Sequence, residues 1–155
     1  MGPENIEEFG AALEGEAPLV AYLEAAAPGL LAATPDEIAA EMGGLISEVD
    51  KQVLTGEFAQ FMADSTTGAL ATGVAGWRDD DLAFLAGWGF DLAAITTPVS
   101  IWQGDQDRMV PFEHGRWLAA HVAGATVHLE PGEGHLSLMI GAFARIAAEL
   151  AALRV

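Results

Sequence analysis

The sequence predicts an α/β protein in which a helical region over residues 1–87 precedes a strand-helix-strand-helix unit over residues 88–155, with an incomplete parallel sheet. Three observations support this class. Helix-start signals recur through the first region, short apolar runs typical of buried strands appear after residue 90, and a helical pattern separates those two runs. Two strands joined by a helix in this way form a parallel pair with a right-handed crossover.

Proline and N-cap signals mark the helices of the first region. Pro3 and Pro18 stand where a first helical turn accepts proline, and Thr34-Pro35-Asp36-Glu37 combines an N-cap, an N1 proline and a capping-box glutamate. Ser47 is a candidate cap for a short helix, and the acidic run Asp79-Asp80-Asp81 suits the start of another. We therefore expect helices over residues 4–13, 17–27 and 35–45 and within 55–75, with short helices after residues 47 and 79.

The second region contains two short apolar runs that predict strands. The first covers residues 98–102 and the second covers residues 125–129. Pro111 starts the helix between them, which Gly124 ends, and an alanine-rich segment over residues 136–153 predicts a final helix. Ligands of open parallel sheets bind beyond the carboxyl ends of the strands, so the loops after the two strands are the first places to look for chemistry.

Composition limits the classes of function. The chain has 155 residues, 52% of them hydrophobic, which is enough for one compact core. Its 23 acidic and 6 basic residues give a net charge of -17, which disfavours binding to nucleic acid or to an anionic membrane surface. There is no cysteine, and the acidic amino terminus does not look like a signal peptide, so we expect a cytoplasmic protein.

Two loop motifs stand after the predicted strands. The segment over residues 98–111 reads Pro-Val-Ser-Ile-Trp-Gln-Gly-Asp-Gln-Asp-Arg-Met-Val-Pro, and the segment over residues 131–135 reads Pro-Gly-Glu-Gly-His. The first resembles the strand and acid loop of the α/β-hydrolase family, in the form Pro-Val-x-x-x-x-Gly-x-x-Asp-x-x-Val-Pro, and the second resembles the family's histidine loop. The resemblance covers residues 88–155, and the helices before them resemble the cap that many members insert ahead of the acid strand.

The resemblance implies roles for two residues. His135 would act as general base and then general acid, and Asp107 would fix its tautomer and stabilise the imidazolium ion. Asp105 is the competing carboxylate in the same loop. The resemblance implies no cofactor, and the other histidines, His114, His121 and His128, have neither patterned neighbours nor the spacing of a metal site. The tryptophans and phenylalanines over residues 77–102 are expected in the core, with lining of an acyl pocket as the alternative.

The family's nucleophile is missing from the chain. No Gly-x-Ser-x-Gly turn occurs, and the four serines, Ser47, Ser65, Ser100 and Ser137, stand in predicted helices, a predicted strand or a helix start. One hypothesis is therefore a carboxy-terminal hydrolase fragment of the esterase or lactonase type, inactive alone. A non-catalytic binding or assembly module derived from the same fold is the alternative, and activity through an unconventional nucleophile or an activated water is the third.

A two-stranded parallel sheet would leave exposed edges and a bare face. We therefore expect the chain either to self-associate, as a dimer or larger assembly, or to bind a complementary amino-terminal hydrolase half. A small hydrophobic ester is the kind of ligand that the resemblance implies. The substrate itself cannot be read from the sequence, because specificity in this family lies in the cap and loops.

Overall fold

The computed structural model describes residues 1–153, which divide into two compact units. The first comprises residues 1–45 and 54–88, and the second comprises residues 46–53 and 89–153. The predicted division fell between residues 87 and 88, so it differs in segment 46–53, which packs with the carboxy-terminal unit. This short segment matters for the site described below.

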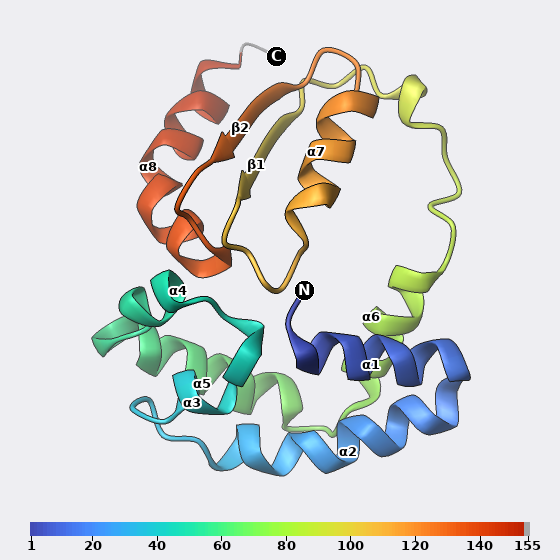
Figure 1. Cartoon of the computed structure of the whole chain (residues 1–155), viewed down its shortest axis with the longest axis vertical. Helices are drawn as coiled ribbons and strands as arrows, with labels where there is room; N and C mark the ends of the chain where they lie inside the picture. The colour runs from blue at the N-terminus through green and yellow to red at the C-terminus, as the bar shows by residue number, and fades with distance from the viewer. Residues whose placement is uncertain (154–155) are drawn as a thin grey trace. The chain divides into compact units, whose positions relative to one another are not determined.

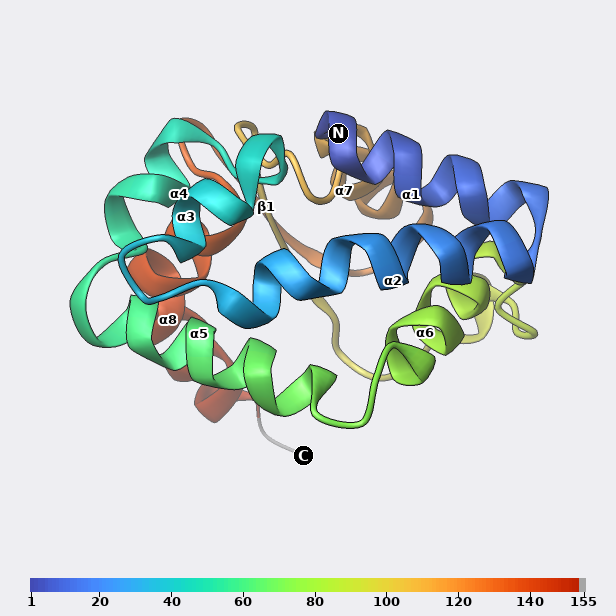
Figure 2. The same cartoon turned by 90° about the horizontal axis from the view of Figure 1, so that it is seen from below.

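The first unit consists of helices (Figures 1 and 2). A core of Ala12, Leu19 and Leu23 joins the first two long helices, and the partly buried Trp77 packs against it. Pro28 lies inside the second helix, which was expected to end at residue 27, and the predicted helix over 35–45 is replaced by two short ones. The elements are α1 (Pro3–Glu14), α2 (Glu16–Ala32), α3 (Ile38–Glu41), η1 (Gly43–Leu45), α5 (Gly56–Leu70) and α6 (Ala75–Leu85).

The second unit contains a two-stranded parallel sheet, which confirms the mixed α/β class and the incomplete sheet. Its register pairs Ser100 with Thr126 and Gly104 with Glu130. Both strands lie one or two residues later in the chain than predicted. The elements are α4 (Glu48–Val53), η2 (Leu92–Ala94), β1 (Ser100–Gly104), α7 (Phe112–His121), β2 (Thr126–Glu130) and α8 (His135–Ala152).

Helices α7 and α8 flank the strand pair on opposite sides (Figure 1). Successive side chains of a strand point to opposite faces, so Gln103 faces Gly115 of α7 while Trp102 lies under the guanidinium of Arg145 of α8. A β-carbon at Gly115 would come within 2.7 Å of the Gln103 side chain, so glycine allows α7 to approach the sheet closely. Strand β1 is thereby covered on both faces, where a bare face was expected, whereas Thr126 and Val127 of β2 are exposed.

Helix α8 carries an exposed apolar stripe. By length and composition alone it could cross a membrane, with a mean hydropathy of 1.3, although core helices of soluble proteins pass the same test. Its polar side chains contact β2: Arg145 pairs with Glu130 at 2.9 Å and Glu149 with His128 at 2.8 Å. The exposed side chains of the stripe are Met139, Ile140, Phe143 and Leu150.

Candidate active site

The acid loop and the histidine loop are joined by backbone hydrogen bonds at the carboxyl ends of β1 and β2. The Gln106 amide donates to the Glu133 carbonyl at 2.8 Å, and the Gly132 amide donates to the Asp105 carboxylate at 2.8 Å. Gly104 lies so close to the Glu133 carbonyl that any β-carbon at this position would clash with it. Asp105, the competing carboxylate, therefore binds the loop and not the imidazole.

Asp107 and His135 lie within hydrogen-bonding distance. The ring of His135 donates from Nδ1 to Oδ2 of Asp107 at 2.9 Å, since a carboxylate has no proton to give. The Asp107 side chain is only 4% exposed and that of His135 is 41% exposed. With Nδ1 bound to Asp107, Nε2 is the nitrogen available to a group from outside.

Asp107 is held in place by its own loop and strand. Its Oδ1 accepts the Val110 amide at 2.8 Å, and its Oδ2 accepts the amide of Gln103 at 2.9 Å. The same Gln103 nitrogen also donates to the Val110 carbonyl at 3.2 Å. Sequence reasoning missed Gln103, which lies on β1 and directs the carboxylate toward the imidazole.

The environment of His135 favours its protonated form. The hydrogen bond to Asp107 raises the pKa of the imidazole above its usual value, burial opposes this, and the charges of Asp107 and Asp50 add to the increase. A histidine held in one tautomer by a buried carboxylate can take a proton at Nε2 and return it. This is the chemistry of a general base and acid.

The residue that sequence reasoning missed most clearly is Asp50. It lies on α4, is fully buried, and accepts hydrogen bonds from the backbone amides of His135, Leu136 and Ser137. Burial opposes its ionisation, but these hydrogen bonds and those from Ser47 outweigh that effect and lower its pKa. The only sequence signal was the pattern Ser47-x-x-Asp50, which indicated a cap on the residue's own helix.

The four serines lie in settings that differ from a nucleophile turn. Ser47 donates to Asp50 at 2.8 Å, and Ser137 donates to Glu133 at 2.6 Å while accepting the Gly134 amide. Ser100 accepts the indole N–H of Trp102 at 2.7 Å, and Ser65 lies within α5 of the other unit. The three serines of the unit that contains His135 are thus engaged by other partners.

Two of the remaining histidines stack on tryptophans, and His114 is exposed in the first turn of α7. His128 stacks on Trp102 and bonds Glu149, and the His121 ring stacks on Trp117. Within residues 1–153, no group of three histidine, aspartate or glutamate side chains is placed to hold a metal ion.

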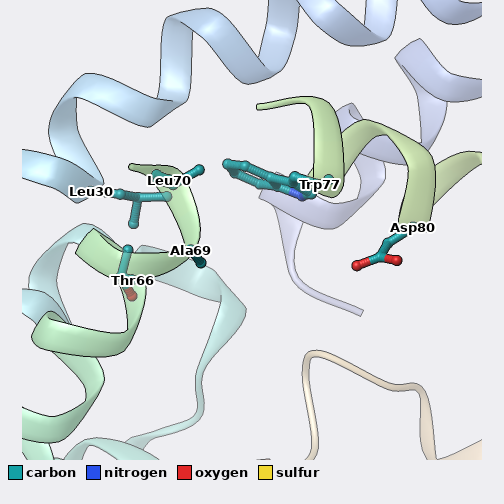
Figure 3. Close-up of a pocket in the computed structure, with 7 residues that line it drawn as sticks. Leu30, Thr66, Ala69, Leu70, Trp77 and Asp80 are labelled. Atoms are coloured by element: carbon teal, nitrogen blue, oxygen red, sulfur yellow. The ribbon is translucent and has the colours of Figure 1, made fainter. Parts of the chain in front are cut away.

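A separate cavity of about 410 Å³ lies in the helical unit between α2, α5 and α6. Leu30 and Leu70 lie across it from the indole of Trp77, and Asp80 stands at one side (Figure 3). Trp77 both packs on the core and lines the cavity, whereas Phe84, Trp88 and Phe90, which were also expected in the core, are exposed. The cavity contains neither Asp107 nor His135.

Comparison with protein-family models, with curated protein sequences and with solved structures found no match to this chain. The hydrolase resemblance therefore depends on the two loop motifs and on the geometry of the unit that carries them.

Proposed function

We propose that this chain supplies the acid and the histidine of a split hydrolase active site of the esterase or lactonase type, with the serine nucleophile on a second polypeptide. The observation that carries the proposal is the 2.9 Å hydrogen bond from His135 to the buried Asp107, between loops that follow two parallel strands. Ligands bind at this end of open parallel sheets. Asp107, by its burial and its other hydrogen bonds, has the surroundings of a group that orients its partner.

In the proposed reaction, a serine hydroxyl from the second polypeptide hydrogen-bonds to Nε2 of His135. The imidazole takes the hydroxyl proton as the serine oxygen attacks the ester carbonyl, and then gives that proton to the leaving alcohol. Asp107 keeps Nδ1 protonated and stabilises the imidazolium ion. Water repeats the same steps on the acyl-serine, which releases the acid and restores the serine.

The second polypeptide is proposed to add its strands at β1. Among residues 1–153, β1 pairs with β2 alone, although β1 is the more buried strand and resembles an inner strand of a larger sheet. An inner strand without a second neighbour leaves a row of backbone donors and acceptors for a further strand. Self-association through the same edge is the competing outcome.

The test uses the reading frame directly upstream of Met1. We expect it to encode a Gly-x-Ser-x-Gly turn, and we expect the two purified polypeptides to cleave p-nitrophenyl butyrate only when mixed. A fluorophosphonate probe should label the upstream polypeptide in the mixture, and His135→Ala should abolish both signals, whereas His121→Ala should not. An upstream frame without that turn, or a mixture no more active than buffer, would overturn the proposal. Turnover by this chain alone would favour an unconventional nucleophile or an activated water.

A second candidate function is a non-catalytic binding module, and the exposed stripe of α8 favours it. Large apolar side chains gathered on one exposed helix face often mark a protein interface. If this candidate holds, Phe143→Asp should weaken binding to the partner at least tenfold, while Asp107→Asn and His135→Ala leave it unchanged. Isothermal titration with the upstream polypeptide measures this binding. Cleavage of p-nitrophenyl butyrate by the same mixtures separates the two functions, because a split hydrolase loses cleavage in Asp107→Asn and His135→Ala, whereas a binding module cleaves with none of the variants.

A further inference from the structure

The amino terminus of α8 is capped by a side chain from a distant part of the chain. Its N-cap residue is Gly134, which has no side chain to accept the free amides of the first turn. Asp50 takes that place, although it lies 85 residues before His135. Its Oδ1 accepts the Leu136 amide at 2.8 Å and the Ser137 amide at 2.9 Å, and its Oδ2 accepts the His135 amide at 3.2 Å.

The fit around this carboxylate is close on every side. Asp50 is fully buried, and its Oδ2 also accepts the Ser47 amide at 3.1 Å and the Ser47 hydroxyl at 2.8 Å. A β-carbon at Gly134 would clash with both Asp50 oxygens and with the Ser47 hydroxyl. Glycine at position 134 is therefore what allows the carboxylate to reach the helix.

His135 is thus held at two points by two carboxylates. Asp107 binds its ring, and Asp50 binds its backbone amide, so the direction of the Cα–Cβ bond and the direction of the ring are both fixed. A capping glycine followed by a first-turn histidine would otherwise be free to fray, because helix ends are the least constrained part of a helix.

We propose that Asp50 is a positioning residue for His135, which anchors the backbone at the start of α8 and so sets the imidazole against Asp107 without touching the reacting atoms. This inference rests on the proposed function for its catalytic meaning. The charged groups that act on His135 are Asp107 and Asp50, and both favour the imidazolium ion. Asp50 contributes through its charge and through the backbone that it anchors.

The test is a titration of His135 by NMR in the chain alone, comparing Asp50→Asn with the native protein. The asparagine keeps the size and one acceptor oxygen but removes the charge, so we expect the His135 pKa to fall toward its usual value. The Nδ1 proton signal should broaden as the hydrogen bond to Asp107 loosens. Asp105→Asn is the matched control, because it removes a carboxylate of the neighbouring loop and should leave both signals unchanged.

A folded Asp50→Asn chain with the native His135 pKa and a sharp Nδ1 proton signal would overturn the inference and leave Asp50 a helix cap only. If Asp50→Asn does not fold, Ser47→Ala gives the second test, since it withdraws one hydrogen bond from the same oxygen that binds the His135 amide. We expect faster exchange of the Nδ1 proton in that variant, and an unchanged rate would contradict the proposal.

The titration needs neither substrate nor a second polypeptide, so its outcome does not depend on whether a split hydrolase is reconstituted. In a reconstituted enzyme, Asp50→Asn should lower kcat about tenfold with little change in KM, because it disturbs the base and not the binding of ester. If Asp50→Asn leaves the His135 pKa unchanged and the native mixture of polypeptides is inactive, both the positioning role and the proposed function fail. If the His135 pKa falls but the native mixture is inactive, only the proposed function fails.

Discussion

Each unit contains two buried acidic side chains, and the two pairs differ in what surrounds them. In the carboxy-terminal unit, Asp50 and Asp107 are surrounded by backbone amides, a glutamine amide and an imidazole. In the helical unit, Glu8 of α1 and Asp81 of α6 lie close enough to repel one another. Trp77 donates its indole N–H to Glu8 at 2.6 Å, but no described residue hydrogen-bonds to Oδ2 of Asp81.

The contrast shows that burial alone does not determine whether a carboxyl group is ionised. Hydrogen bonds lower the pKa of Asp50 in spite of its burial, whereas burial raises the pKa of Asp81 to about 7. The charge of Glu8, a side-chain hydrogen bond with Glu8 and then the charge of Asp80 add to that increase. The first arrangement keeps a charge where it can direct an imidazole. The second arrangement favours the protonated form of Asp81, which packs as a neutral group between α1 and α6.

The largest effect should come from removing the carboxylate at position 50. Asp50→Ala leaves three helix amides and the Ser47 hydroxyl without their acceptor in a buried place, so we expect a loss of about 3 kcal/mol in the free energy of unfolding. Urea unfolding at pH 7 measures this. Asp105→Ala, which removes one exposed carboxylate and its hydrogen bond from the Gly132 amide, should cost about 1 kcal/mol or less. Equal losses in the two variants would contradict the contrast.

The acid pair of the helical unit should respond in the opposite direction. The raised pKa of Asp81 means that the folded chain binds a proton more tightly than the unfolded chain, so stability is greatest below about pH 4 for this group and falls as pH rises toward 7. Asp81→Asn should therefore stabilise the chain by about 2 kcal/mol at pH 8 and have little effect near pH 4. Thermal unfolding at both pH values checks this, and a variant that is less stable at pH 8 would refute it.

A smaller effect is expected at position 107. The pKa of His135 is raised by Asp107, so the pair contributes stability that is present below about pH 6.5 and is lost as pH rises through the folded pKa. Asp107→Asn should cost about 1 kcal/mol at pH 6 and less at pH 9, because the neutral imidazole no longer gains from the charge. Unfolding curves at the two pH values test this. A loss that grows with pH would reverse the assigned sign.

The sequence could predict which end of the sheet carries Asp107 and His135 because its signals are local. Each loop motif follows its strand directly, so parallel geometry places both loops at the same end of the sheet, and the hydrolase resemblance then selects Asp107 and His135 within them. The strands begin and end one or two residues later than predicted, because the sequence has no clear boundary between each apolar run and the loop that follows it. The helix predicted over residues 17–27 is longer in the structure, because α2 continues through Pro28 to Ala32 in spite of the hydrogen bond that proline removes.

The contribution of Asp50 could not be predicted because it depends on tertiary packing. The pattern Ser47-x-x-Asp50 is a local capping signature, and the same oxygens that bond Ser47 also accept amides from a helix far along the chain. Gln103 was missed for a different reason: it lies within the acid-loop motif, but at a position that the family pattern leaves unspecified, and its contacts with Asp107 and Val110 appear only in the folded loop.

The long separation between Asp50 and the first turn of α8 has a consequence for how the chain folds. Contacts between residues this far apart close a large loop and form late, since the entropy of closure comes before any gain from the contact. The strands and the body of α8 can assemble from neighbouring segments, whereas the turn that bears His135 must wait for segment 46–53 to dock. Mutations at position 50 should thus speed unfolding more than they slow folding, and the histidine should be the last part of the carboxy-terminal unit to reach its native geometry.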